Sequence, residues 1–132
     1  MQTETKLQIR FNDIDMAGHV HNSVYLNYFE QGRLDFFNLL GGEDWDWRTR
    51  GLILGRNEVD YLKPIRLRDE VYVRVKCDHV GNKSFSLSYE IYSKEGKSEI
   101  LHTKGRSIMV CMDYKTETTV EVYAEWRSKL EK

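Results

Sequence analysis

Hydrophobic and polar residues recur along the chain with two different periods. Hydrophobic and polar residues alternate, as is typical of strands with one buried face, over 5–11, 71–77 and 85–91, and two further runs predict strands over 52–62 and 98–112. The turn residues Gly81-Asn82 and 94–97 join the last three runs along the chain, as in an antiparallel meander. The only proline, Pro64, cannot donate to a strand ladder and marks the end of the run over 52–62. Gly105 predicts a bulge or bend in the longest run, and 116–122 predicts a final short strand.

The other period is helical. Apolar residues and one glycine recur every three or four residues, which gives one face of a helix over 23–40: Tyr25, Phe29, Gly32, Phe36 and Leu39/Leu40. Asn22 or Ser23 is a suitable N-cap, and Gly41-Gly42 is a suitable stop. Because Gly32 lies on the apolar face, we expect the helix backbone to lie close against a sheet there.

These elements predict an α+β protein with the order β-α-β-β-β-β, folded as a single domain over residues 1–132. Residues 43–50 lack a clear period and predict a loop or short turn, and 123–131 predict a helical turn. One face of the sheet packs on the helix. The other face carries Tyr72, Tyr92 and several charges, so we expect it to be moderately polar and available to contact another subunit.

Composition and charge exclude several classes of protein. Hydrophobic residues make up 40% and charged residues 31%, which is typical of a soluble globular protein. A net charge of −1 gives no field that attracts nucleic acid or an anionic membrane, and no apolar run approaches the ~20 residues that span a bilayer. Cys77 and Cys111 are too few for a disulfide scaffold, and residues 1–6 are polar, without an apolar signal core. We therefore expect a cytoplasmic protein.

Polar and conformationally permissive residues gather directly before the helix: Asp13, Asp15, Gly18, His19, His21 and Asn22. A helix N-terminus offers unpaired N–H donors, so polar groups beside it can act on an acyl carbonyl. Gly18 allows an unusual backbone, and the N–H groups from Gly18 to Asn22 can form an oxyanion hole. This loop is the candidate active site.

The loop residues also have structural interpretations. Asp15 can attack an acyl carbonyl, act as general base on a water, or merely cap a turn. Asn22 can orient a substrate or cap the helix, and the two roles are compatible. Asp13 is expected to tie the loop to neighbouring backbone. Glu30, on the helix, is a second candidate acid, or a salt-bridge partner of Arg33.

A metal site is an alternative interpretation of the same loop, because imidazoles and carboxylates bind zinc and His19 and His21 form a His-x-His pair. No further group of ligands is evident, since His79 and His102 lie in separate predicted strands. The spacing also fails the calcium-loop pattern, which needs a glutamate where this chain has Val24. We expect no metal.

Two stretches of sequence resemble a known family. They are residues 10–30, RFNDIDMAGHVHNSVYLNYFE, and residues 58–64, EVDYLKP, followed by Asp69. They resemble the 4-hydroxybenzoyl-CoA thioesterase-like branch of the acyl-CoA thioesterases, which have the hotdog fold. The resemblance extends over nearly the whole chain. It implies a curved antiparallel sheet wrapped around the helix at 23–40.

The resemblance also implies an activity: hydrolysis of an acyl-CoA to an acid and a thiol, without a metal or other cofactor. The catalytic aspartate of the family's D-x-x-G-x-V pattern is Asp15 here. Asn22 stands where some members have histidine and others have asparagine. Tyr25 and Tyr28 are expected to line the acyl pocket. The enzyme is expected to be a homo-oligomer, a dimer or a tetramer, with each active site completed by a second subunit.

Other functions stay open on the same fold: an acyl-carrier-protein thioesterase, or a non-catalytic module that binds acyl-CoA or lipid. A hotdog dehydratase is disfavoured, because the Asp/His pair expected on its helix is not apparent. Basic residues offer either CoA-phosphate contacts or solvated surface charge; they are Lys63, Arg66 and Arg68 around Pro64, with Lys104 and Arg106 further along.

Overall fold

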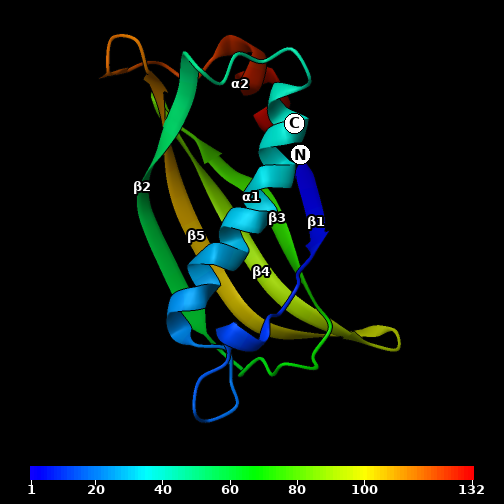
Figure 1. Ribbon diagram of the computed structural model, residues 1–132. Coiled ribbons are helices and arrows are strands. Elements are labelled where there is room, and N and C mark those ends of the chain that lie inside the picture. The colour runs from blue at the N-terminus through cyan, green and yellow to red at the C-terminus, as the bar shows by residue number, and fades with distance from the viewer.

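A curved antiparallel sheet half-encloses one long helix in the computed structural model, which describes all residues 1–132 (Figure 1). The strands are β1 (Gln2–Lys6), β2 (Arg50–Tyr61), β3 (Val71–Val80), β4 (Ser84–Glu95), β5 (Ser98–Asp113) and β6 (Thr118–Thr119). The helices are α1 (Tyr25–Gly41) and α2 (Ala124–Leu130), with short 3₁₀ turns η1 (Phe11–Asp13) and η2 (Asn22–Val24). The strand order is β1-β3-β4-β5-β2, and β6 pairs with β5. The predicted hotdog fold of the α+β class is confirmed.

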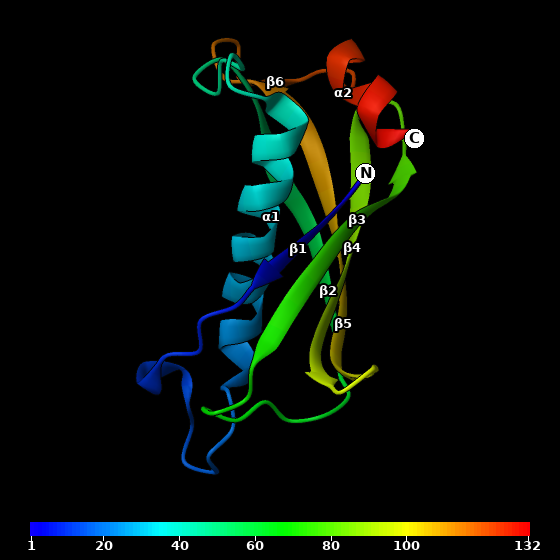
Figure 2. The ribbon, with the colours of Figure 1, turned by 90° about the vertical axis from the view of Figure 1, so that its right-hand side faces the viewer.

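Helix α1 lies against the concave face of the sheet (Figure 2). The predicted apolar face is buried at Tyr25, Phe29, Gly32, Phe36 and Leu40, whereas Leu39 is exposed. A Cβ atom at Gly32 would stand 2.8 Å from Val75 and 2.9 Å from Val73, so the glycine lets α1 approach β3 closely. The helix ends as predicted, with Gly42 as C-cap at a φ of 72°. Neither α1 nor α2 is long and apolar enough to cross a membrane.

The first strand lies earlier than the alternation of Leu7, Ile9 and Phe11 predicted. β1 pairs with β3 over Gln2–Lys6, and β3 begins at Val71, so the ladder ends after the Leu7 N–H donates to the Val71 carbonyl at 2.9 Å. Leu7 is buried, but Phe11 is 80% exposed in η1. The prediction was wrong because a strand needs a partner ladder as well as a pattern. The strand predicted at 116–122 likewise shrinks to β6.

The bulge predicted at Gly105 is also absent. The registers shift instead at Gly55 in β2, at Asp78 in β3 and at His102 in β5. Gly105 has a different role, because a Cβ atom there would stand 2.3 Å from the Phe29 ring. The glycine therefore makes room for an aromatic side chain of α1 on the sheet.

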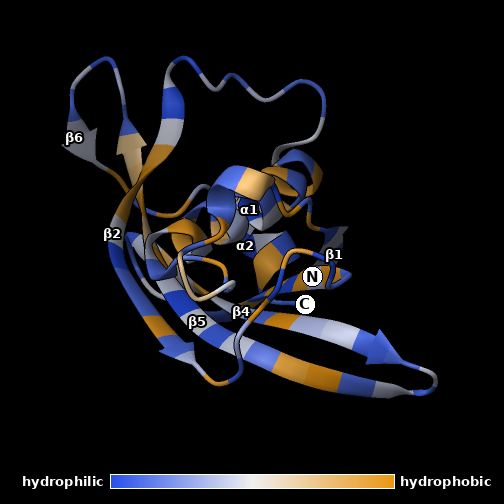
Figure 3. Ribbon diagram, turned by 60° about the horizontal axis from the view of Figure 1, so that its bottom comes forward, coloured by the Kyte–Doolittle hydropathy of each residue, from blue (hydrophilic) through white to orange (hydrophobic).

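The convex face of the sheet carries stacked tyrosine rings that are covered by charged side chains. The Tyr72 and Tyr92 rings stack with centroids 5.8 Å apart. The Arg74 guanidinium lies 4.2 Å from the Tyr92 centroid, and the Lys94 ammonium lies 4.2 Å from that of Tyr72. Figure 3 shows hydrophilic and hydrophobic residues alternating along the strands of the sheet. That this face contacts another subunit stays a prediction.

An aromatic cluster closes the end of the molecule around the C-terminus of α1. It is made of Trp45 and Trp47 from the 43–49 loop and Tyr123 and Trp126 at α2, with ring centroids 4.7 to 6.3 Å apart. The Arg50 guanidinium lies 4.2 Å from the Trp45 centroid and 4.7 Å from that of Tyr123. The loop at 43–50 was predicted, but this cluster was not.

Candidate active site

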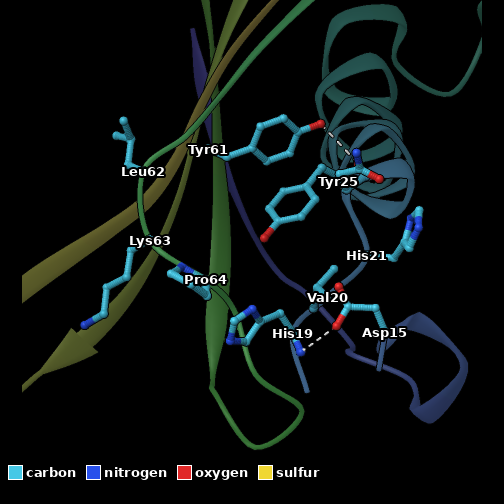
Figure 4. Close-up of a pocket in the computed structure, with 10 residues that line it drawn as sticks. Asp15, His19, Val20, His21, Tyr25, Tyr61, Leu62, Lys63 and Pro64 are labelled. Atoms are coloured by element: carbon cyan, nitrogen blue, oxygen red, sulfur yellow. Dashed lines mark hydrogen bonds between the residues drawn. The ribbon is translucent and has the colours of Figure 1, made fainter. Parts of the chain in front are cut away.

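A cavity of about 460 Å³ opens at the other end of α1, where the predicted loop meets the end of β2 (Figure 4). Its lining residues come from the polar loop, the start of α1 and the segment after β2: Asp15, His19, Val20, His21, Asn22, Tyr25, Tyr61, Leu62, Lys63 and Pro64. Four predicted site residues, Asp15, His19, His21 and Asn22, are therefore brought together with Tyr25.

The loop that carries Asp15 is a tight hairpin. Ile14 and Val20 form an antiparallel bridge, and the Asp15 N–H donates to the His19 carbonyl at 2.8 Å. Gly18 does not line the cavity, but its φ of 81° makes the reversal possible, since side chains rarely tolerate that conformation. The predicted backbone role of Gly18 is therefore observed in the turn.

One Asp15 carboxylate oxygen is held and the other is free. Oδ1 accepts the N–H groups of Ala17 at 2.9 Å and His19 at 3.1 Å, whereas Oδ2 accepts none. The carboxylate is half-buried at the cavity wall. The turn-capping interpretation of Asp15 is thus correct for one oxygen, and the second oxygen is available to a water or a substrate.

The start of the helix differs from the prediction. The residue that caps η2 is His21, whose Nδ1 accepts the Ser23 N–H at 3.1 Å and bonds the Ser23 hydroxyl at 2.8 Å. Neither Asn22 nor Ser23 is the N-cap, and α1 follows η2 without a side-chain cap. The Asn22 N–H has no acceptor within the chain, and its side chain is exposed. Asn22 is therefore not the helix cap, and its role in orienting a substrate stays a prediction.

Asp13 is structural, as expected. It is 1% exposed, and its carboxylate accepts the Arg10 N–H at 2.9 Å and the Tyr28 hydroxyl at 2.7 Å. Burial alone would raise the pKa of Asp13, but these hydrogen bonds and the Arg10 guanidinium outweigh it and hold the pKa below its ordinary value. The Tyr28 hydroxyl is used here and Tyr28 does not line this cavity, so its role in an acyl pocket stays a prediction.

Glu30, the second candidate acid, lies outside the cavity. It is exposed in a shallow groove beside Gln8, Arg10 and Asn27. Its predicted salt bridge with Arg33 does not form, because Arg33 turns inward and donates to the Tyr89 hydroxyl at 3.2 Å. Within one chain, Glu30 therefore does not act beside Asp15.

The wall formed by residues 62–65 is held by His102, which sequence analysis did not select. His102 is the extra residue at the register shift between β4 and β5, and its backbone carbonyl accepts the N–H groups of both Leu62 and Lys63 at 3.0 Å. Its buried imidazole bonds the Pro64 carbonyl through Nδ1 at 3.1 Å and the Ser93 hydroxyl through Nε2 at 2.9 Å. No local signal could reveal contacts across 38 positions.

The basic residues are divided between two faces. Lys63 lines the cavity, and the Arg66 guanidinium lies 4.0 Å from the position of a Cβ at Gly18. Arg106 lies on the convex face, paired with Asp78 at 3.1 Å, and Lys104 follows the same alternation of β5. Only the group around Pro64 can serve a ligand in this cavity. No three His, Cys, Asp or Glu side chains gather in a group that could hold a metal ion.

The sequence over residues 9–130 matches the family model of the thioesterase-like superfamily. The chain belongs to this family. This confirms the family predicted from the loop motif and the class of enzyme, a thioester hydrolase.

Relatives agree with this assignment. The chain is 25% identical to the long-chain acyl-CoA thioesterase FadM of Escherichia coli, over 97% of this chain and 96% of that one. It is 30% identical over 92 residues to the uncharacterized protein YsmA of Bacillus subtilis, a match that spans 70% of this chain and 62% of YsmA. A thioesterase of Thermus thermophilus, solved with coenzyme A and zinc, is 28% identical, with a TM-score of 0.84 over 98% of this chain and 97% of that one.

Proposed function

We propose that this protein hydrolyses acyl-CoA thioesters in the cavity around Asp15, and that residues 1–132 act as one hotdog domain. The observation that carries the proposal is the pair of unused groups at the helix start: the free Oδ2 of Asp15 and the free N–H of Asn22. Hydrolysis needs a base or nucleophile and a donor for the oxyanion, and these two groups supply one each.

The reaction follows from their chemistry. Asp15 either takes a proton from a water that attacks the thioester carbon, or attacks that carbon itself to give an anhydride that water then opens. On either route the carbonyl oxygen gains negative charge, which the Asn22 N–H stabilises at the positive end of the helix. Collapse of the tetrahedral species breaks the C–S bond and releases CoA as its thiolate.

The cavity mouth favours a phosphorylated carrier for the acyl group. Lys63 lines the mouth, Arg66 lies beside Gly18, and both ammonium and guanidinium groups bind phosphates. Two relatives support CoA as this carrier, since FadM is a long-chain acyl-CoA thioesterase and the Thermus thioesterase was solved with coenzyme A. An acyl-carrier protein offers a phosphopantetheine arm of similar chemistry and is the alternative.

The proposal includes a homo-oligomer whose subunits meet along β2. This strand of twelve residues is at the end of the sheet and pairs only with β5, so its other edge offers free N–H and C=O groups. Leu54, Tyr61 and Leu62 beside that edge are 44 to 55% exposed. A second copy, pairing antiparallel about a two-fold axis, would cover both the edge and these side chains. A tetramer would use a further face.

The unpaired thiols of Cys77 and Cys111 agree with a cytoplasmic location.

The test is thiol release from a panel of short, long and aromatic acyl-CoAs by the wild type and Asp15→Asn. We expect turnover by the wild type and a loss of about 10²–10⁴-fold in kcat/KM for the variant, the range of general acid–base catalysis. Asp44→Asn is the matched control, because Asp44 is an exposed carboxylate in the 43–49 loop, at the other end of α1 from the cavity.

Either of two results would refute this function. Turnover of no acyl-CoA would point to a carrier-protein substrate or to a binding module, and a full rate for Asp15→Asn would remove Asp15 from the chemistry. A binding module should retain CoA affinity in both variants without any release of thiol.

A further inference from the structure

The backbone donors of the loop are almost all committed to the protein itself. Five N–H groups between Gly18 and Ser23 donate to acceptors within the chain. The donors and acceptors are Gly18 N–H to Asp15 O at 3.1 Å, His19 N–H to Asp15 Oδ1 at 3.1 Å, Val20 N–H to Ile65 O at 2.7 Å, His21 N–H to Asp13 O at 2.8 Å and Ser23 N–H to His21 Nδ1 at 3.1 Å. The oxyanion hole predicted from Gly18 to Asn22 therefore reduces to one backbone donor, the Asn22 N–H. Any second donor must come from a side chain.

Two tyrosine hydroxyls are present in the cavity, and only one is free to donate. The Tyr61 hydroxyl donates to the Asn22 carbonyl at 3.1 Å. The Tyr25 hydroxyl donates to no group of the chain, although Tyr25 is only 4% exposed and lines the cavity. The hydroxyl is therefore available as a donor to a ligand.

The position of this ring is fixed. Tyr25 meets Tyr61 edge to face, with centroids 4.8 Å apart at 90°, so its rotation is restricted before any ligand binds. Figure 4 shows its hydroxyl on the side of the ring that faces Pro64 and His19. Burial raises the pKa of Tyr25, although the Ile65 backbone amide opposes this, so the hydroxyl keeps its proton at neutral pH.

Asn22 and Tyr25 are also placed together by the backbone. Asn22 opens the 3₁₀ turn η2 and Tyr25 opens α1, which follows η2 directly, and both residues line the cavity. Because the N–H groups of a helix N-terminus point out of its end, a carbonyl oxygen bound in the cavity against this end can accept the Asn22 N–H. The two donors come from a single rigid element, which suits a site that must be organised before reaction.

We propose that Tyr25 is a catalytic residue whose hydroxyl donates a hydrogen bond to the thioester carbonyl oxygen, jointly with the Asn22 N–H, as that oxygen becomes an oxyanion. The inference rests on the proposed hydrolysis at Asp15. When water or Asp15 adds to the carbonyl carbon, the electron pair of the C=O bond moves onto oxygen, and both donors hold it there. When the C–S bond breaks, the pair returns to form the carbonyl, and Tyr25 keeps its proton throughout.

This role differs measurably from that of an acyl-pocket residue. In Tyr25→Phe the ring and its packing on Tyr61 remain, and only the hydroxyl is removed. We expect kcat to fall about 10²-fold with KM unchanged, and by the same factor for every acyl chain, since loss of one oxyanion donor costs about 10²–10³ in rate. Tyr72→Phe, which removes a hydroxyl on the convex face, is the matched control and should keep the wild-type rate.

A binding measurement separates the two states of the substrate. CoA alone should bind Tyr25→Phe as tightly as the wild type. A CoA-linked trifluoromethyl ketone, whose hydrate or adduct carries a tetrahedral oxyanion, should lose about the same factor of 10² in affinity as kcat loses. Calorimetry on the folded variants gives both values without turnover.

The possible results separate the role of the Tyr25 hydroxyl from the acyl-CoA hydrolysis on which it depends. If the wild type hydrolyses acyl-CoA and Tyr25→Phe keeps full kcat, the inference is wrong while the function stands. A change confined to KM, or one that depends on chain length, would assign Tyr25 to the acyl pocket and equally overturn the inference. A full rate in Tyr25→Phe together with a loss in His19→Ala would give the second donor to His19 instead. If the wild type releases no thiol, the function itself fails.

Discussion

The two ends of α1 satisfy their backbone groups in different ways. At the C-terminal end, the Gly42 N–H donates to the Asn38 carbonyl at 3.0 Å and the Lys129 ammonium donates to the Leu40 carbonyl at 2.9 Å. At the N-terminal end no side chain caps the helix, and the Asn22 N–H is unused. The protein itself pairs the groups of one end, and at the other end the Asn22 N–H is available to the proposed substrate.

The side chains around these ends follow the same division. The aromatic cluster buries Trp126 completely and places the Arg50 cation against the rings of Trp45 and Tyr123 and 2.8 Å from Glu125. The cavity end leaves the Asp15 carboxylate half-buried with one oxygen unpaired. We infer that the aromatic end contributes mainly stability and the cavity end mainly function, at some cost in stability.

The largest effect on stability is expected at the aromatic end. Trp126→Ala should lower the free energy of unfolding by about 3–5 kcal/mol, because it opens a cavity among packed rings. Urea unfolding measures this, and the folded fraction should retain the wild-type kcat. Trp126→Phe is the control: the indole N–H has no partner, so this variant should lose less than about 1.5 kcal/mol. A loss of catalysis equal to that of Asp15→Asn in folded Trp126→Ala would contradict the division.

A smaller effect is expected from the buried support of the loop. Tyr28→Phe removes a donor from the buried Asp13 carboxylate and should cost about 1–3 kcal/mol at pH 7. Because the pKa of Asp13 is lowered in the folded state, its contribution is present above its unfolded pKa of about 4 and is lost as the pH falls through the folded pKa. The difference between variant and wild type should therefore shrink toward pH 3. A difference that stays constant with pH would show that Asp13 is not the charged partner.

A glycine pair tests whether backbone strain and catalysis coincide. Gly18→Ala and Gly96→Ala both place a side chain at positive φ, 81° and 60°, and each should cost about 1–2 kcal/mol. Only Gly18→Ala should also lower kcat, because it distorts the turn that holds Asp15. Equal activities in the two variants would separate the turn geometry from the chemistry.

The smallest effect on stability is expected for Asp15→Asn, the variant for which we expect the largest loss of rate. Asp15→Asn keeps an amide oxygen that can accept the Ala17 and His19 N–H groups, so the free energy of unfolding should change by less than about 0.5 kcal/mol. Thermal and urea unfolding of the variant used for the activity panel check this. A loss above about 1.5 kcal/mol, the size expected when a hydrogen bond to a charged group is lost, would make Asp15 a structural residue as well.

Local patterns predicted most of the framework. Helix α1, its glycine stop, the meander β3-β4-β5 and the close approach at Gly32 all follow from periodicity and from one glycine on an apolar face. The first strand was misplaced because pairing with β3, which begins at Val71, decides its length. The bulge was assigned to Gly105 because glycine often marks one, whereas the register shift at His102 depends on the strand opposite.

The site was predicted in part. Asp15, His19, His21, Asn22 and Tyr25 share one short stretch, so their spacing and family motif were enough to bring them together. The helix cap was assigned to the wrong residue, because histidine is a less usual cap than asparagine or serine. The role of His102 depends on contacts with Pro64 that only the folded chain creates.

The hydrogen bond from the Val20 N–H to the Ile65 carbonyl, at 2.7 Å, has a consequence for motion. It joins the loop that carries Asp15 to the segment anchored by His102, so we expect the two walls of the cavity to open together. Amide hydrogen exchange should therefore differ sharply over two positions, slow at Val20 and fast at Asn22. Substrate entry would then be a single concerted opening, with one rate for the whole mouth, rather than the independent fluctuation of two loops.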